Sequence, residues 1–293
     1  MTVAAPPTLT ICIPTLGRTS LVERALPSVL AVSSVPLEVV VAVNRPGVLP
    51  DDPSLHDERV RALPDVPGGV SAVRNAAARE ARGQVLLFLD DDDAFVPGGV
   101  ELLAELMADP RVDFASASCR VLDGSGEIRT RRPRALGPLF DHAVGDYLPG
   151  MFAVRAAAFR AVGGYNTDIT FGENTEMVMR ICRRAHAEDR RVLAMDRVVV
   201  ERWPSSVRYV KEAADSALVL LDVHREVFAR EPVERARLQQ VAGVARFRGG
   251  DRSGGRRLLW AGLRSNPRDA RAYYRLAISL VPPLATRTWS RGA

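Results

Sequence analysis

The chain has 293 residues, 47% of them hydrophobic, which is enough for one large domain or for a medium domain with an appendage, and too apolar for a disordered chain. Its net charge of +5 at pH 7 comes mostly from arginine, a composition compatible with phosphate-rich ligands or an anionic membrane surface but specific for neither. Nucleic-acid binding is not expected, because the densest basic run, residues 129–134, contains no aromatic side chain.

The first ten residues contain neither the basic leader nor the long apolar segment of a signal peptide, and no stretch approaches the roughly 20 apolar residues of a membrane span. The three cysteines, Cys12, Cys119 and Cys182, are odd in number and lack metal-ligand spacing, which indicates reduced thiols packed as small apolar groups. We therefore expect a cytoplasmic protein whose residues 1–8 are disordered, with peripheral contact at the inner face of the membrane left open.

A strand, a helix and a second strand open the chain. Residues 9–13 are an apolar run of strand length that ends at a Pro-Thr-Leu-Gly-Arg loop, residues 14–18. A helix is predicted over 19–32, and a second apolar strand over 37–43 ends at Asn44. This order is typical of a parallel sheet whose loops gather at the carboxyl edge of the strands, where ligands bind.

The third predicted strand, residues 84–89, ends at four consecutive aspartates, Asp90 to Asp93. Before it, the residues up to about 67 are interpreted as a variable polar stretch, and Ser71 as the cap of a helix over 72–82. Four adjacent carboxylates repel one another, so a compact fold tolerates them best around a cation or pointing into water. Oxygen ligands favour Mg²⁺ or Mn²⁺ over zinc, and a solvated acidic turn is the alternative.

The remaining elements complete an α/β domain that we expect to span residues 9–205, with an all-helical appendage over 206–293. Strands are predicted at 114–121, 151–154 and 192–201, helices at 100–107, 155–162 and 174–185, and a long loop at 129–147. The appendage is predicted to contain helices at 207–230, 232–248, 252–265 and 268–281. Its segment near 236–280 resembles one tetratricopeptide-like hairpin, although a self-standing solenoid needs about three repeats.

Several separated segments resemble the family 2 glycosyltransferases, which have the GT-A fold. The matching segments are TICIPTLGR at 10–18, GVSAVRNAAAREARG at 69–83, the Asp-x-Asp segment FLDDDDAFVP at 88–97, Gly163-Gly164-Tyr165, and the acidic helix at 173–180. They occur in the family's order over about residues 8 to 205. The resemblance implies a Rossmann-like, mostly parallel sheet flanked by helices.

The same resemblance implies a donor and metal site at the carboxyl edge of the sheet. Asp92 is expected to bind Mn²⁺ or Mg²⁺ directly, Asp90 to contact the ribose and the metal, and Asp91 and Asp93 to orient the loop or support the metal ligands. The donor-binding residues that it implies are Pro14, Thr15, Arg18, Asn44, Arg74, Asn75, Asp90, Asp91 and Gly150. Two alternatives stay open: Arg18 as a surface ion pair, and Arg74 as a partner of an aspartate in the cluster.

Three departures from the family pattern concern specificity and catalysis. Asn44 stands where an aspartate commonly reads the base, and an amide can both donate and accept hydrogen bonds. Glu173-Asn174 replaces a Glu-Asp pair whose Asp is the general base, and Asn174 cannot accept a proton in that role. Glu173 is the favoured substitute over Glu176, whose carboxylate the helix dipole would stabilise, although both could simply be helix-capping acids. Trp203 lies near the place of a missing histidine, where it would stack on a sugar or pack under the appendage.

The leading expectation is an inverting, metal-dependent glycosyltransferase that moves a sugar from a nucleotide-diphosphate sugar to a hydroxyl acceptor in a polysaccharide, a glycolipid or a natural product. His142, in the long loop, is a further candidate for substrate contact. A sugar nucleotidyltransferase is disfavoured, because no glycine-rich phosphate loop follows the first strand. A non-catalytic nucleotide-sugar-binding or scaffold protein remains the alternative because of Asn174, with the helical appendage binding partners.

Overall fold

The computed structural model describes residues 9–122, 128–135, 144–145, 148–203 and 210–290. The chain divides into two compact units. The first, which we call the sheet unit, comprises Met1–Thr167 and Glu173–Ser205, and the second, the helical unit, comprises Asp168–Gly172 and Ser206–Ala293. The expected disorder of residues 1–8 and the candidate His142 lie outside the described residues.

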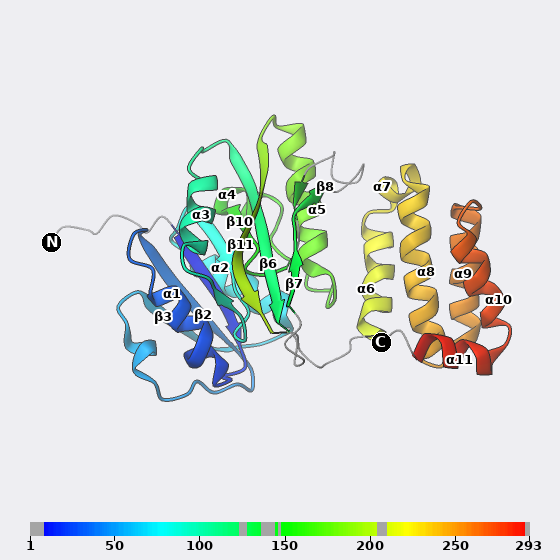
Figure 1. The fold of residues 1–293 in the computed structure, drawn as a ribbon, viewed down its shortest axis with the longest axis horizontal. Coiled ribbons are helices and arrows are strands. Elements are labelled where there is room, and N and C mark those ends of the chain that lie inside the picture. Colours follow the sequence, from blue (N-terminus) through cyan, green and yellow to red (C-terminus); the bar gives the residue numbers. More distant parts are fainter. Residues whose placement is uncertain (1–8, 123–127, 136–143, 146–147, 204–209, 291–293) are drawn as a thin grey trace. The chain divides into compact units, whose positions relative to one another are not determined.

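The sheet unit is built on a nine-stranded sheet with the order β3-β2-β1-β4-β10-β6-β11-β5, in which β7 also pairs with β6 (Figure 1). Strands β3, β2, β1 and β4 run parallel, β10 is antiparallel to both of its neighbours, and β11 is again parallel to β6. The bounds are Leu9–Thr15 for β1, Leu37–Asn44 for β2, Val60–Val66 for β3, Val85–Phe88 for β4, Ala94–Phe95 for β5, Val112–Leu122 for β6, Phe152–Arg155 for β10 and Arg191–Arg202 for β11. The predicted α/β class, with a mostly parallel sheet, is confirmed.

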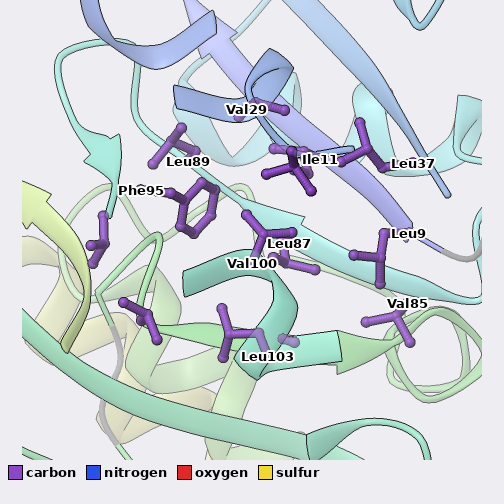
Figure 2. Close-up of a cluster of buried hydrophobic side chains, with 14 of the residues drawn as sticks. Leu9, Ile11, Val29, Leu37, Val85, Leu87, Leu89, Phe95, Val100 and Leu103 are labelled. Carbon is purple, nitrogen blue, oxygen red and sulfur yellow. The ribbon is translucent and has the colours of Figure 1, made fainter. Parts of the chain in front are cut away.

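Helices cover this sheet, which explains why its central strands are apolar along their whole length. All seven residues of β1 are buried. The helices are Leu21–Ala25 (η1, a π-helical turn), Leu26–Leu30 (α1), Val70–Glu80 (α2), Gly99–Leu106 (α3), Ala156–Ala161 (α4) and Glu173–Ala187 (α5). Figure 2 shows how Val29 of α1 and Val100 and Leu103 of α3 pack over Ile11 and Leu87 from β1 and β4.

Two local predictions were wrong for backbone reasons. Ser71 is not a helix cap, because α2 already begins at residue 70, two residues before the predicted start, and has the extended Gly69 as its N-cap. The preceding Gly68 has a φ of 105°, a conformation that lets the chain turn into the helix before Ser71 is reached. The single helix predicted over 19–32 is instead the η1 turn followed by α1.

Strands with weak hydrophobic patterns were missed. The supposed polar stretch before residue 67 contains η2 (Pro53–His56) and β3. The latter is an edge strand whose residues are all partly or fully exposed, and it contains a proline. The loop predicted over 129–147 contains β7 (Ile128–Arg131), which pairs with β6, and the short pair β8 (Arg134–Ala135) and β9 (Val144–Gly145). Backbone pairing, which leaves no periodic signal in a polar sequence, defines these strands.

The helical unit is all helix in its described elements, as predicted. The long helix expected over 207–230 is divided at His224, and a last helix, α11, was not predicted. The bounds are Val210–Val223 (α6), Arg225–Arg230 (α7), Pro232–Arg248 (α8), Arg252–Ser265 (α9), Ala270–Ser279 (α10) and Pro282–Ser290 (α11). The predicted hairpin segment thus holds α8, α9 and α10.

Close helix packing and aromatic contacts stabilise this unit. A Cβ atom on Gly255 of α9 would lie 2.7 Å from the carbonyl oxygen of Gly243 in α8, so the two helices meet at glycines. The rings of Phe247 and Trp289 meet edge to face, with their centroids 5.1 Å apart. Among the described residues, no helix is long and apolar enough to cross a membrane.

Truncation of a central side chain tests the core. Leu87 is fully buried in β4, so Leu87→Ala should lower the free energy of unfolding by about 2–5 kcal/mol through lost burial and a residual cavity. Urea denaturation followed by circular dichroism measures the change. Met195→Ala, at an exposed position of β11, is the control and should change stability by less than about 0.5 kcal/mol. Equal losses in the two variants would contradict this description of the core.

Candidate active site

The acidic loop after β4 meets the loop after β1 at the carboxyl edge of the sheet. Thr15, the last residue of β1, donates a hydrogen bond from Oγ1 to Oδ2 of Asp91 at 2.6 Å. The Arg18 guanidinium, which is 53% exposed, has Nη1 3.3 Å from Asp91 Oδ1 and 3.5 Å from Asp92 Oδ2. The predicted convergence of the loops after β1 and β4 is therefore present, because the two strands are parallel neighbours.

Asp90 is held by two arginines from different elements. Its Oδ1 lies 2.6 Å from Nη2 of Arg74 in α2, and its Oδ2 lies 3.0 Å from Nη2 of Arg202 at the end of β11. Burial by itself would raise the pKa of Asp90, but the two guanidinium charges outweigh it and lower this pKa below its ordinary value. Asp90 is therefore ionised in the folded protein. The alternative in which Arg74 pairs with an aspartate of the cluster is observed.

Asp93 is fully buried beside the same arginine. Arg202 Nε lies 2.6 Å from Asp93 Oδ2 as an ion pair without the alignment of a hydrogen bond, and the backbone N–H of Trp203 donates to Oδ1 at 3.1 Å. Burial raises the pKa of Asp93 to about 8, and the charges of Asp90 and Asp92 add to this effect despite Arg202. Burial, followed by the charge of Asp90, also raises the pKa of Asp92.

These carboxylates fit a hard divalent cation. Asp90, Asp92 and Asp93 can each offer one oxygen such that the three atoms lie within 4.8 Å of one another. The donors are all oxygen, as Mg²⁺ and Mn²⁺ prefer, and Asp93 Oδ2 receives no hydrogen bond within the described part of the chain. Burial, and after it the charge of neighbouring aspartates, raises the pKa of Asp92 and of Asp93, and a bound cation would favour their ionised forms.

Asp93 lies closer to the candidate metal ligands than the sequence led us to expect. The sequence assigned it a supporting role, whereas its carboxylate lies in the same cluster as those of Asp90 and Asp92. The loop folds back through a turn in which the N–H of Asp93 donates to the carbonyl oxygen of Asp90 at 3.2 Å. A turn within a run of like residues cannot be placed from their identities alone.

The start of α5 is tied to the acidic loop through Arg74. The other guanidinium nitrogen of this residue, Nη1, donates to Glu173 Oε1 at 2.7 Å. Asn174 Nδ2 donates to the same oxygen at 2.8 Å, and Asn174 Oδ1 accepts from the hydroxyl of Tyr165 at 2.9 Å. Glu173 therefore has one oxygen held by two donors.

Glu176 has a different environment. Its side chain is 1% exposed and forms an ion pair with Arg180, one turn further along α5. A carboxylate that is both buried and paired within its own helix is poorly placed to meet an acceptor hydroxyl. Glu173 is also buried and ion-paired, but its partner Arg74 lies outside α5, and its Oε2 takes part in neither of the two hydrogen bonds just described.

The other predicted donor-binding residues fall into two groups. Pro14 and Asn44 lie at the carboxyl ends of β1 and β2, and the buried Oδ1 of Asn44 has no hydrogen-bond partner among the described residues. Asn75 instead makes two 2.8 Å hydrogen bonds with the backbone of Tyr165. Gly150, with a φ of 80°, donates to the carbonyl oxygen of Phe88 at 2.6 Å. Backbone contacts thus hold the latter two.

No site role was predicted from the sequence for Arg202, or for Tyr165 beyond its place in the Gly163-Gly164-Tyr165 segment. Arg202 ends the last long strand, close to where the family's histidine was expected, so a cation at that strand end was the available signal. Trp203, considered for sugar stacking or for packing under the appendage, lies within the sheet unit with its ring 4.5 Å from the guanidinium carbon of Arg24. This cation–π contact gives Trp203 a structural partner.

The fold is similar to that of a solved structure, S. aureus TarS. S. aureus TarS (residues 1–349), crystallised in complex with UDP-GlcNAc, superposes with a TM-score of 0.59 over 97% of this chain and 92% of that chain. The sequence identity is 15%, so the likeness concerns the fold alone. A structure of the same TarS fragment with UDP gives a TM-score of 0.55 at 16% identity, with 98% of this chain and 92% of that chain covered.

The sequence relatives match only part of this chain. An uncharacterised protein of Mycobacterium tuberculosis is 27% identical over 62% of this chain and 64% of its own length. The uncharacterised glycosyltransferase EpsJ of Bacillus subtilis is 25% identical over 44% of this chain and 38% of its own, and one from Haemophilus influenzae is 27% identical over 39% and 40%. The chain thus spans less than two thirds of each of these relatives.

The family itself is established by a match over half of the chain. Residues 10–163 match the model of the glycosyl transferase family 2, a segment that includes the loop after β1, helix α2 and the four aspartates. This agrees with the family inferred from the sequence motifs, and with the fold. The chain belongs to the family 2 glycosyltransferases.

Proposed function

We propose that the protein transfers a sugar, with inversion, from a nucleotide-diphosphate sugar to a hydroxyl group of an acceptor. The observation that carries this proposal is the cluster of Asp90, Asp92 and Asp93, joined through Arg74 to Glu173. A carboxylate cluster that could hold a cation and a candidate base thus belong to one network at one edge of the sheet. Family membership supports the reaction class, and the TarS complex with UDP-GlcNAc supports the class of donor.

Asp92 and Asp90 would hold the cation, and Asp93 would add Oδ2, which is paired with Arg202 but accepts no hydrogen bond among the described residues. A bound Mn²⁺ or Mg²⁺ would supply positive charge that stabilises the departing diphosphate. Arg18 is mostly exposed beside Asp91 and Asp92, so its guanidinium can reach phosphate oxygens from the solvent side. The cation and Arg18 would together place positive charge where the negatively charged leaving group would lie.

The donor would be recognised along the loops that end β1 and β2. The buried side-chain oxygen of Asn44, Oδ1, has no hydrogen-bond partner among the described residues and would accept a hydrogen bond from a base N–H. Pro14, Thr15 and Asp91 would shape the nucleotide side of the site. Arg74, Asn75 and Gly150 would support the donor-binding loops indirectly, because their polar groups already form hydrogen bonds within the protein.

Glu173 is the proposed general base. The acceptor hydroxyl oxygen attacks the anomeric carbon from the face opposite the diphosphate, and the new C–O bond forms as the bond to the diphosphate oxygen breaks, with its electron pair leaving on that oxygen. The hydroxyl proton passes to Oε2 of Glu173, because Oε1 already accepts from Arg74 and Asn174. Asn174 then orients the base instead of acting as one.

Two features support a membrane-associated acceptor and an intracellular location. The three cysteines are buried and none of them forms a disulfide bond, as expected in a reducing compartment. Residues 232–290 carry twelve arginines and three acidic residues, a net charge of +9. The same helices expose large apolar and aromatic side chains, Trp260, Tyr273, Tyr274, Leu280 and Leu284. We propose a cytoplasmic enzyme whose helical unit contacts anionic lipid at the inner face of the membrane.

A donor panel tests the reaction. The purified chain, incubated with Mn²⁺, a panel of nucleotide sugars and a mixture of hydroxyl-bearing polysaccharide and glycolipid acceptors, should release nucleoside diphosphate. Glu173→Gln should lower kcat by about 100-fold or more because the base is lost. Coupled detection of the released diphosphate gives both values. Glu188→Gln, at an exposed position just after α5, is the control and should leave kcat unchanged. Donor binding without turnover in the unmodified protein would favour the non-catalytic alternative.

Metal binding is tested independently of turnover. Asp92→Asn should weaken Mn²⁺ binding by about tenfold or more, because it removes a charged ligand oxygen. Isothermal titration of Mn²⁺ into the protein measures the affinity. Asp196→Asn, in an exposed ion pair with Arg132, is the matched control. Unchanged affinity in Asp92→Asn would contradict the assignment of the metal ligands.

Vesicle flotation tests the membrane contact. The protein should float with vesicles that contain anionic phosphatidylglycerol and remain behind with pure phosphatidylcholine, since each arginine near an anionic surface contributes about 1 kcal/mol. Replacement of Arg271 and Arg275 by Gln together should reduce flotation at least severalfold. Replacement of Arg160, an exposed residue of α4 in the sheet unit, is the control. Equal flotation with both vesicle types, or with neither, would contradict a contact with anionic lipid.

A further inference from the structure

Arg74 is a buried side chain that joins two carboxylates from distant parts of the sequence. The residue is 3% exposed. Nη2 lies 2.6 Å from Asp90 Oδ1, which is 16 residues away in sequence, and Nη1 lies 2.7 Å from Glu173 Oε1, which is 99 residues away. One guanidinium thus links the metal loop with the first residue of α5.

The surroundings leave Arg74 little freedom to choose other partners. Its guanidinium carbon lies 5.5 Å from the ring centroid of Tyr165, and its buried Nε has no hydrogen-bond partner among the described residues. A buried charge is costly unless it is neutralised, so Arg74 depends on these two carboxylates. Its positive charge is divided between them.

Asp90 is also shared. Its second oxygen faces Arg202, and it belongs to the cluster that fits a divalent cation. A cation that takes up part of the Asp90 charge would leave less of that charge for Arg74, which would then depend more strongly on Glu173. Because such coupling of binding free energies is reciprocal, a change at Glu173 must also alter cation affinity.

We propose that Arg74 is a positioning residue that couples cation binding at Asp90 to the placement of Glu173, an inference that rests on the proposed function. Asn174 completes the arrangement, because its amide and Arg74 hold the same oxygen of Glu173. Neither of these two hydrogen bonds uses Oε2 of Glu173, the oxygen that would take the acceptor proton in the proposed function. The replacement of the family's usual aspartate by Asn174 then becomes part of the device that orients the base.

The coupling is measured on the full chain without any donor. Mn²⁺ is titrated calorimetrically into the unmodified protein, Glu173→Gln, Arg74→Met and the double variant. Glu173→Gln should weaken Mn²⁺ binding about fivefold, because the whole charge of Arg74 then competes with the cation for Asp90. The same substitution in the Arg74→Met background should change the affinity less than about twofold, since the link is gone.

Another arginine that bridges two carboxylates, Arg184 on α5, provides the matched control. Arg184 joins Asp113, at 2.8 Å, to Glu188, at 2.5 Å, and neither carboxylate belongs to the acidic cluster. Glu188→Gln removes a carboxylate charge from an arginine bridge that is more exposed than that of Arg74, and it should leave Mn²⁺ affinity unchanged. Thermal unfolding of each variant by circular dichroism establishes that the compared proteins are folded.

Turnover supplies a readout that a merely structural role would not produce. Arg74→Lys keeps the charge but cannot hold two carboxylates with a planar fork, so it should lower kcat about tenfold or more while the donor KM changes less than threefold. If Arg74→Lys is not folded, the Mn²⁺ comparison of Glu173→Gln with Glu188→Gln decides the question, since neither changes Arg74.

The outcomes separate this inference from the proposed function. Equal Mn²⁺ affinity in Glu173→Gln and the unmodified protein would overturn the coupling, even if the enzyme turns over a donor. A fivefold loss that disappears with Arg74→Met would support the coupling, even if no donor in the panel reacts and the proposed function fails. Absence of any Mn²⁺ binding to the unmodified protein would overturn both.

Discussion

Concentrated negative charge at the end of a buried strand is the constraint on which the site depends. The aspartates at 90–93 leave β4 together, and burial disfavours the charged form of every one of them. Arg18, Arg74 and Arg202 neutralise part of this charge from three different elements. Burial, with a smaller contribution from the charges of Asp90 and Asp92, still raises the pKa of Asp93 despite Arg202. A divalent cation would remove the remaining excess.

The arginines that compensate this charge also organise the rest of the site. Arg202 brings the end of β11 to the acidic loop, and Arg74 brings in both α2 and the start of α5. The proposed base is thus attached to the metal loop through a charge that the loop itself requires. An asparagine at position 174 is compatible with this arrangement, because it donates a hydrogen bond to Glu173 that an ionised aspartate could not donate.

Much of the fold was predictable from the sequence, because buried parallel strands are apolar runs with clear ends. β1, β2 and β4 were located within a few residues, whereas the polar edge strand β3 and the short β7 were not, since pairing and not hydrophobicity defines them. The acidic run was equally visible in the sequence. The two ion pairs of Arg74 were not predictable together, because the distant one joins residues 99 positions apart that only tertiary packing brings into contact.

The central claim is that the carboxylates after β4 hold a divalent cation. Diffraction at the manganese absorption edge, from crystals grown with Mn²⁺ and a nucleoside diphosphate, tests it most directly. We expect one strong anomalous peak among Asp90, Asp92 and Asp93, at about 2.0–2.2 Å from their oxygens and beside the diphosphate. An ordered diphosphate with no anomalous peak at these carboxylates would contradict it.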